Sequence, residues 1–463
     1  MFARFILPCI ACLFFGNSWL HSAGLALENH KTGTTVDYQV ALLSGTVETG
    51  ARSIQVANTS TPEKPRISEG VVHENRFKAL VELIPGQNRL ALKSDLSEDL
   101  VWIDLDYVES TNPYYMRLIW MTDNSGATDF ATPVDDHPQE YEARMQTAAL
   151  LMQTFTAERM HEAGYGRRTF RLERDAAGKV IVHTLKTPQS AEDYALLTGN
   201  QWWGQVGNWL SRDHPDKYAK NMVLAAYTRK ESGTGKMINH TALGGGNLGL
   251  FGSASVFSWP RSLDEARTVF ADSTMIDPAR VHDDSSRRSV VWGLVSTTVG
   301  AALHEMGHTF GLPHTKDPHD IMTRGFDHFG RAFTFFDPPS RVNLRPKVFQ
   351  KDEEAKWAPV SASALRWSRW FAGNDPQHPS EERPTIGFDM AAGTATLRCS
   401  AGLRWTGFIS NGDAIAFREF TEPEAPVEVV LKLDEIQAMM DGLPLTRVAV
   451  LSANGAREGR DLE

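Results

Sequence analysis

Alternating apolar and polar positions mark short strands at both ends of the chain, and longer helical stripes mark its middle. Near the N-terminus the apolar positions recur with the period of two that turns one face of a strand toward a core. Turn residues such as Gly50 and Pro85-Gly86 separate these runs. The regular spacing predicts a small antiparallel sandwich over residues 27–110. The runs are residues 35–40, 53–56, 77–83 and 89–92.

The middle of the chain carries the strongest helical pattern. Residues 137–163 place Met152 and Phe155 on one stripe, which we interpret as core rather than as a cofactor-binding face. The next run, residues 167–173, is expected to form a strand. Two further elements are expected downstream, namely a buried strand over residues 221–226 and a tryptophan-rich helix around residues 361–371.

The last part of the chain returns to short strands. The proline-rich stretch 373–384 predicts a linker, and a small β domain is expected over residues 376–463. The expected strands in it are residues 395–397, 414–417, 427–433 and 448–451.

Residues 1–26 have the pattern of an export signal. Arg4 gives a basic start, and the apolar run over residues 5–15 is too short to cross a bilayer comfortably. The small residues before Leu27 suit cleavage at that point, and cleavage after Ala23 is a second option. An uncleaved anchor is the alternative interpretation.

Composition narrows the class of protein further. Apolar content of 41% and charged content of 22% are typical of a soluble globular chain. The net charge of −10 argues against nucleic acid and anionic membranes as partners. Signal removal would leave Cys399 as the single cysteine, which we interpret as a buried free thiol. We therefore expect a secreted or periplasmic protein without stable membrane insertion.

The segment His-Glu-Met-Gly-His carries the clearest chemistry. His304 and His308 lie about one helical turn apart, so both rings project from the same face. Zinc prefers neutral imidazole nitrogens, and a catalytic site takes three protein ligands and leaves one position open. Glu305 follows the first ligand and is placed to accept a proton from water.

The residues that follow complete the pattern. Gly311 can adopt positive φ, which would end the helix and bring His314 back as the third ligand. The whole motif has the metzincin form, and Met322 lies where metzincins place the methionine of the Met-turn. Some metzincins have a metal-reaching tyrosine two residues later. Arg324 occupies that position here, so three protein ligands are expected.

A glycine-rich segment, residues 241–252, precedes the zinc motif. It lacks the Gly-Lys-Ser/Thr ending of a phosphate-binding loop. In a metzincin the edge strand above the cleft lies before the zinc helix and pairs with extended substrate. We assign residues 246–252 to that strand, with a purely structural loop as the alternative. The expected substrate-binding residues are Gly246, Asn247, Leu248, Gly249 and Leu250.

Further acidic and imidazole groups flank the motif. Asp283 and Asp284 are expected to cap the zinc helix, with a calcium site as the alternative. We expect His319 and His328 to neighbour the ligands or lie at the surface, because three ligands are already supplied.

The chain resembles a family of zinc metallopeptidases best represented in fungi, where a jacalin-like lectin domain often follows the catalytic part. The resemblance covers about residues 36–372 and implies a zinc peptidase. The tail of this chain lacks the glycine-rich jacalin pattern. A second, local resemblance is that of residues 77–92 to the hairpin of bacterial immunoglobulin-like domains. The family resemblance is carried by residues 155–160, 166–171, 241–252, 259–260 and 303–333.

These patterns together predict an α+β chain. A metzincin-like zinc peptidase domain with a mixed sheet and an active-site helix is expected over residues 111–375, flanked by small all-β domains. The expected activity is Zn²⁺-dependent hydrolysis of a peptide or protein substrate, with Glu305 as general base. Two alternatives stay open. One is a zinc-containing protein that binds a surface, polymer or glycan through its β domains, and the other is an amidase acting on a non-protein amide.

Overall fold

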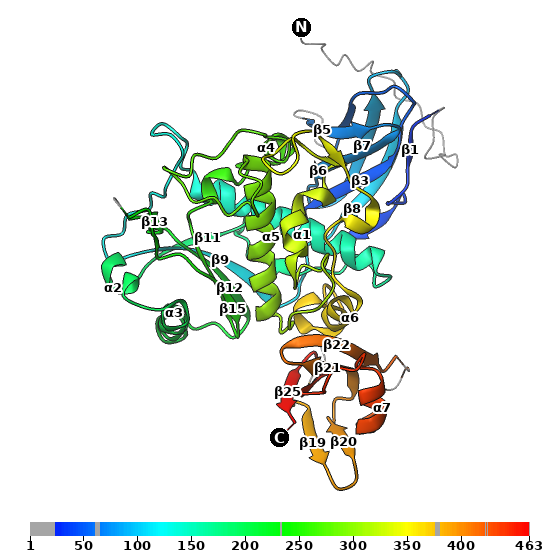
Figure 1. Cartoon of the computed structure of the whole chain (residues 1–463). Coiled ribbons are helices and arrows are strands. Elements are labelled where there is room, and N and C mark those ends of the chain that lie inside the picture. Colours follow the sequence, from blue (N-terminus) through cyan, green and yellow to red (C-terminus); the bar gives the residue numbers. More distant parts are fainter. Residues whose placement is uncertain are drawn as a thin grey trace.

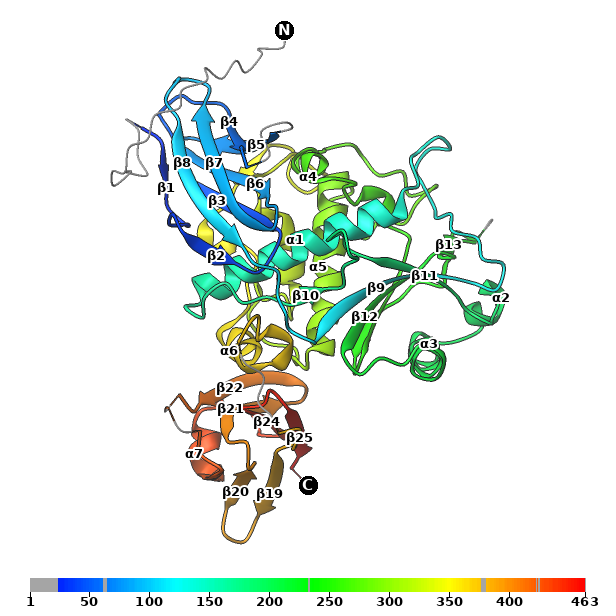
Figure 2. The same cartoon turned by 180° about the vertical axis from the view of Figure 1, so that it is seen from behind.

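The computed structural model describes residues 24–60, 65–231, 234–375, 380–421, 423 and 425–462. Within them the chain forms a mixed α+β fold with several sheets and few helices. Figure 1 and, from behind, Figure 2 show a β-rich N-terminal unit (blue), a central unit around α5 and a C-terminal β unit (orange to red). Among the described residues, no helix combines the length and apolar character needed to cross a bilayer. The expected export signal lies almost entirely outside the described residues.

Strand β5 joins the two halves of the N-terminal sheet, whose described strands follow the order β1-β3-β6-β5-β4-β7-β8-β2. Residues 66–70 of β5 pair with β4, and residues 71–73 pair with β6. Buried apolar side chains from both halves form one core. The strands are β1 Ala26–Leu27, β2 Thr34–Val36, β3 Val40–Thr46, β4 Ile54–Asn58, β5 Arg66–His73, β6 Arg76–Glu82, β7 Gly86–Ser94 and β8 Val101–Tyr107.

The predicted hairpin over residues 77–92 is wrong. Strand β6 pairs with β3 and β5, whereas β7 pairs with β4 and β8. The side-chain amide of Asn88 donates to the carbonyl oxygens of Ile84 and Gly86, both at 2.8 Å, and its oxygen accepts from the Ile84 N–H. These bonds fold the connection into a tight loop that carries the chain from one half of the sheet to the other.

The central sheet has the order β10-β9-β12-β16-β15, with β11 also pairing with β9. Its pairs are parallel except for β15, which runs antiparallel to β16. The strands are β9 Tyr115–Thr122, β10 Arg171–Leu172, β11 Val182–Lys186, β12 Ala219–Ala225, β15 Ala242–Gly245 and β16 Leu248–Gly252, with a small separate pair β13 Arg229–Lys230 and β14 Met237–Ile238.

Helices cover both faces of this sheet. Leu118 and Trp120 of β9 pack in one core with α1 and α5, whereas Ile119 and Met121 pack with α2 and α3 on the other face. This alternation is the period of two expected of a strand with both faces buried. The helices are α1 Tyr141–Glu162, α2 Ala191–Ala195, α3 Gly199–Asp213, η1 Val256–Ser258, α4 Leu263–Val269 and α5 Val291–Thr309.

The helix predicted over residues 137–163 is present as α1, which begins at Tyr141 because Glu140 has a left-handed φ of 36°. The strand predicted over residues 167–173 is reduced to β10, and the buried strand predicted at 221–226 is β12. The helix predicted over residues 361–371 is divided at Ser368, whose ψ of 133° is extended. The elements after α5 are η2 Arg324–Ala332, β17 Phe336–Asp337, β18 Lys347–Val348, η3 Lys351–Glu353, α6 Pro359–Trp367 and η4 Arg369–Phe371.

The C-terminal unit packs on α6. The indole N–H of Trp405 donates to the Ser363 hydroxyl at 2.9 Å, and that of Trp367 donates to the Glu419 carboxylate at 2.8 Å. Cys399 is a buried free thiol, as predicted. The described elements are β19 Thr385–Asp389, β20 Thr394–Arg398, β21 Leu403–Ser410, β22 Asp413–Glu419, β23 Glu428–Lys432, α7 Leu433–Ala438, β24 Arg447–Ser452 and β25 Arg457–Asp461.

Buried polar contacts fix the N-terminal unit on the central one. Glu354, which follows η3, accepts from Lys78 of β6 and from Arg159 of α1, both at 2.7 Å. The Thr154 hydroxyl of α1 donates to the Val40 carbonyl of β3 at 2.7 Å. Because these groups are buried, the N-terminal sheet is part of the structure that supports α1 and, through it, α5.

Candidate active site

Helix α5 places two imidazoles and one carboxylate on the same side. His304 and His308 lie one turn apart, with Glu305 directly after the first. The helix ends at Thr309, and Gly311 has a φ of 92°, where a side chain would be strained. The Gly311 N–H donates to the His308 carbonyl at 3.0 Å. This left-handed residue turns the chain back toward the helix, as the sequence predicts.

The turn brings His314 to the other two imidazoles. Ring centroids are 4.7 Å apart for His304 and His308, 4.7 Å for His308 and His314, and 5.3 Å for His304 and His314. The Nε2 atoms of His308 and His314 are 3.1 Å apart. Two nitrogens bound to one tetrahedral ion at ~2.0–2.1 Å lie ~3.4 Å from each other. The three rings therefore have the spacing of ligands around a single metal ion.

Backbone carbonyls set the tautomers of the two helical histidines. His304 Nδ1 donates to the Ile321 carbonyl at 2.7 Å, and His308 Nδ1 donates to the Leu312 carbonyl at 2.8 Å. A carbonyl oxygen only accepts, so Nδ1 carries the hydrogen and Nε2 keeps a free lone pair. Burial lowers the pKa of both rings, that of His304 to about 3, and the proximity of His308 adds to the effect on His304. Both rings are thus neutral, which metal binding requires.

Glu305 is a buried carboxylate without a cationic partner among the described residues, and only 8% of it is exposed. Burial raises its pKa to about 7, against the opposing effect of the Gly244 N–H, which faces the carboxylate. A buried carboxylate without a cationic partner, beside three histidines with the spacing of metal ligands, is characteristic of a proton-transfer group.

Two glycines bring the β15–β16 hairpin directly onto this part of α5. A Cβ on Gly244 would lie 2.7 Å from the Cα of Glu305, and one on Gly249 would lie 3.1 Å from the Met306 Sδ. Neither strand could approach the helix so closely with a larger residue at these positions. The glycine-rich run 241–252 therefore serves close packing against Glu305 and Met306 of α5.

The assignment of residues 246–252 to the edge strand is wrong. Strand β16 lies between β12 and β15, and all of its residues are buried. Gly246 and Asn247 form the turn before it, and Leu248, Gly249 and Leu250 lie inside the sheet. The physical reason is that the more apolar strand is the one buried on both faces. The edge position belongs to β15, Ala242–Gly245.

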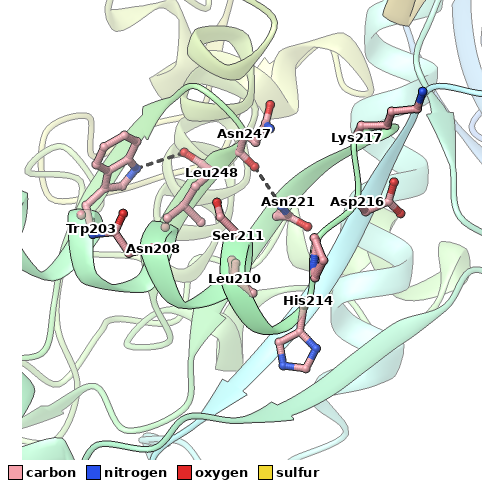
Figure 3. A pocket seen from close by; sticks show the side chains of 13 residues that line it. Trp203, Asn208, Leu210, Ser211, His214, Asp216, Lys217, Asn221, Asn247 and Leu248 are labelled. Carbon is pink, nitrogen blue, oxygen red and sulfur yellow. Dashed lines mark hydrogen bonds between the residues drawn. The ribbon is translucent and has the colours of Figure 1, made fainter.

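Two of the expected substrate-binding residues line a separate cavity of about 450 Å³, beside α3 and the beginnings of β12 and β16. Figure 3 shows that Asn247 and Leu248 face it together with Trp203 and Asn221. The Trp203 indole donates to the Leu248 carbonyl at 3.1 Å, and the Asn221 amide donates to the Asn247 carbonyl at 3.0 Å. His304, His308 and His314 are not among its lining residues.

Met322, the predicted Met-turn residue, packs against the segment of α5 between His304 and His308. It is fully buried, and its sulfur packs against Gly307 of α5. Asp320 holds this turn in place, because its carboxylate accepts from the Thr315 hydroxyl at 2.7 Å and from the Ser361 hydroxyl at 2.9 Å. The loop below the site is thereby tied to α6.

The remaining flanking residues do not join the three histidines. Arg324 binds Asp327 through Nε at 2.9 Å and supplies no ligand. His319 and His328 lie near each other, with ring centroids 6.2 Å apart, outside the cluster of His304, His308 and His314.

The predicted capping of the zinc helix by the acidic pair is wrong. Val290 occupies the N-cap position of α5, and no side chain caps the helix there. Asp283 instead accepts from the Ser285 N–H at 3.1 Å and from the Ser289 hydroxyl at 2.7 Å within its own loop. Its carboxylate is therefore used to shape the segment that leads into α5.

A contact that the sequence did not reveal comes from the C-terminal unit. The Ala414 N–H of β22 donates to the carbonyl of His314 at 2.8 Å. Arg457 of β25 packs where a side chain at Gly311 would be, with its Cδ 2.8 Å from that Cβ position. The loop that carries the third histidine is therefore held by β22 and β25, roughly 100 and roughly 145 residues further along the chain.

Comparisons with known proteins agree with the histidine cluster. Residues 25–403 match the model of a family described as "Putative peptidase family". The chain belongs to this peptidase family. It is 29% identical to the "Putative zinc metalloproteinase C607.06c" of Schizosaccharomyces pombe over 83% of this chain and 66% of the relative. It is 28% identical to the "Putative zinc metalloproteinase YIL108W" of Saccharomyces cerevisiae over 73% of this chain and 53% of that relative. The chain thus spans about half to two thirds of these relatives.

The solved structure of catalytically inactive OgpA from Akkermansia muciniphila, in complex with an O-glycopeptide, is similar at 17% identity and a TM-score of 0.46. The match covers 77% of this chain and 93% of that one. The names of the two yeast relatives support Zn²⁺ as the metal of this family. The donor set fits zinc, since three imidazoles converge on one point and the Nδ1 atoms of His304 and His308 are anchored by backbone carbonyls. The family match ends at residue 403, before the strand that supports His314.

Proposed function

We propose that this chain is a zinc endopeptidase of metzincin type that acts on extended peptide or protein substrates. The observation that carries the proposal is the convergence of His304, His308 and His314 beside a buried carboxylate that has no cationic partner among the described residues, under the edge of a sheet. Membership of the peptidase family supports the reaction class.

The residues of the site have distinct parts in the proposed reaction. His304, His308 and His314 would hold the ion through Nε2. When bound, zinc supplies a Lewis acid that polarises the scissile carbonyl and makes water a better nucleophile. Glu305 accepts a proton from the attacking water as the new C–O bond forms. It then returns that proton to the leaving amine as the C–N bond breaks, so the carboxylate is regenerated.

Strand β15 is the proposed site of substrate pairing. It forms the edge of the central sheet, runs antiparallel to β16 and lies directly over Glu305 through Gly244. An extended peptide could add to this edge through backbone hydrogen bonds, which make little demand on its side chains. The absence of a side chain on Gly244 lets α5 pack directly against β15, which places Glu305 close to the edge where substrate would pair.

We propose further that the protein is exported to the periplasm or secreted. The basic start, short apolar run and small residues near positions 23–26 support this placement. The single cysteine beyond that segment is consistent with a fold that needs no disulfide.

Digestion of a diverse peptide library tests the proposed reaction. The full chain is incubated with the library with and without a chelator, and the products are read by mass spectrometry. Cleavage at internal bonds, lost on chelation and restored by zinc, is the expected result. Zinc bound without cleavage of any peptide would contradict the proposal and favour a binding protein. Hydrolysis confined to non-peptide amides would contradict it in favour of an amidase.

A further inference from the structure

Two histidines and an aspartate outside the catalytic centre lie together near the start of the edge strand. His240 lies between β14 and β15, and His282 and Asp284 belong to the loop between α4 and α5. One ring nitrogen of each histidine and one carboxylate oxygen of Asp284 lie within 4.8 Å of one another. The catalytic histidines meet the same limit. The rings of His240 and His282 meet edge to face with centroids 4.7 Å apart.

The described part of the chain gives these three side chains no other polar partner. Within the described residues, no side-chain hydrogen bond or ion pair involves His240, His282 or Asp284, and the Nδ1 of His240 is buried without a partner. The adjacent Asp283 behaves differently, because it accepts two hydrogen bonds from its own loop. The loop thus engages one carboxylate of the acidic pair and leaves Asp284 facing the histidines. Such a set of unpartnered donors calls for a ligand.

The surroundings hold these donors in place. A Cβ on Gly252 would lie 2.8 Å from the His240 Nδ1, so only glycine leaves room for the ring there. The Thr228 hydroxyl donates to the Asn239 carbonyl at 2.6 Å, and the Asn239 amide donates to the Ala191 carbonyl at 2.9 Å. These bonds fix the backbone immediately before His240. The cluster is therefore built on supported chain rather than on a free loop tip.

The donor types select the class of ion. Two imidazole nitrogens and one carboxylate oxygen are a ligand set typical of zinc, which accepts water as a fourth ligand. Calcium and magnesium instead prefer oxygen ligands in larger numbers. We propose that His240, His282 and Asp284 bind a second zinc ion, which ties the start of edge strand β15 to the loop that precedes α5.

The proposed second ion has a structural role. It lies outside the three-histidine centre and joins two segments that both lead into the catalytic cleft, one through β15 and one through α5. It would hold the end of the edge strand opposite the turn at Gly245 and Gly246. Metal binding at this site does not depend on peptidase activity. The proposed second site and the proposed reaction can therefore be tested independently.

Metal stoichiometry tests the proposal. The full chain carrying Glu305→Gln, which prevents self-digestion, is stripped with a chelator, reloaded with zinc alone and desalted. Elemental analysis should find two zinc ions per chain. A His240→Ala/His282→Ala variant should keep one, and a His304→Ala/His308→Ala variant should also keep one. His161→Ala, which removes an exposed histidine at the end of α1, should keep two.

A second measurement guards against variants that fail to fold. In the His304→Ala/His308→Ala background, zinc should still raise the Tm, because the second site remains. Adding Asp284→Asn, which keeps the size of this exposed side chain, should abolish that rise. One zinc ion per chain in the Glu305→Gln parent, or two in the His240→Ala/His282→Ala variant, would overturn the proposal. Persistence of the Tm rise after Asp284→Asn would exclude Asp284 as a ligand and overturn the site as described.

Discussion

At the scale of a single residue, Gly244 connects edge strand β15 to Glu305, the proposed general base. A Cβ there would lie 2.7 Å from the Cα of Glu305, so Gly244→Ala must push β15 away from α5. We expect a loss of about 1–3 kcal/mol in the free energy of unfolding and a fall in kcat/KM. Gly204→Ala is the matched control, because a Cβ at that position in α3 meets nothing within 4 Å. It should leave kcat/KM unchanged and raise stability slightly. Equal effects of both substitutions in a denaturant titration and a peptide assay would contradict the role of Gly244 in the packing of β15 on α5.

The residues that sequence alone could predict are those whose geometry is local. His304 and His308 share a helix face through their spacing, and the positive φ of Gly311 follows from its place after that helix. Gly244 and Ala414 could not be predicted in this way. Their roles depend on contacts with Glu305 and His314 that only the folded chain creates.

At the scale of elements, β22 supports the loop that carries His314, the proposed third ligand. The Ala414 N–H lies on the outer edge of its sheet and donates to the His314 carbonyl. Ala414→Pro removes that donor, and we expect zinc affinity to fall roughly tenfold or more, with loss of activity at limiting zinc. Ala414→Ser keeps the N–H and serves as the control. Zinc affinity measured by competition with a chromophoric chelator gives the comparison. An unchanged affinity in Ala414→Pro would show that the loop holds His314 without β22.

The first strand bears on where an export signal would be cut. Leu25 and Leu27 are both buried in the N-terminal core, and β1 begins at Ala26. Cleavage before Leu27 would remove part of this strand, whereas cleavage after Ala23 would retain it. We therefore expect N-terminal sequencing of the exported protein to begin at Gly24. A first residue of Leu27 would contradict this expectation and show that the core tolerates the loss of Leu25.

The pattern of the sequence does not show whether β15 or β16 forms the edge of the central sheet. Both strands belong to one glycine-rich run, and the sequence identifies the run without ordering its strands in the sheet. The order depends on which strand pairs with β12, and therefore on long-range contacts. The prediction of a hairpin over residues 77–92 is wrong for a similar reason, since β6 pairs with β3 and β7 pairs with β4.

At the scale of the whole molecule, buried ion pairs couple the N-terminal sheet to the central unit. Burial alone would raise the pKa of Glu354, but Arg159, Lys78 and Lys351 outweigh it and lower the pKa to about 2 from an ordinary value of 4.5. A folded-state pKa below the unfolded one gives stability that is fully present above pH 4.5 and is lost as the pH falls toward 2. The expected loss is about 3 kcal/mol from this group.

Acid unfolding, monitored by circular dichroism, tests the coupling between the N-terminal sheet and the central unit. Glu354→Gln should be less stable at neutral pH, because Lys78 and Arg159 lose their buried partner, and its stability should vary less between pH 4.5 and 2. Glu435→Gln, at an exposed position of α7, should follow the parent curve. If Glu354→Gln unfolded in acid as the parent does, the ion pairs of Glu354 would contribute little to the contact between the N-terminal sheet and the central unit.

Hydrolysis and zinc content measured together on Glu305→Gln test the central claim most directly. The substitution keeps the size of the side chain and leaves the three imidazoles untouched, so the variant should bind zinc at the catalytic centre as the parent does. Loss of the general base should lower kcat/KM on a cleaved peptide by about 10²–10⁴-fold. Glu142→Gln, on the exposed face of α1, should match the parent in both measurements. Parental kcat/KM in Glu305→Gln with full zinc content would contradict the account.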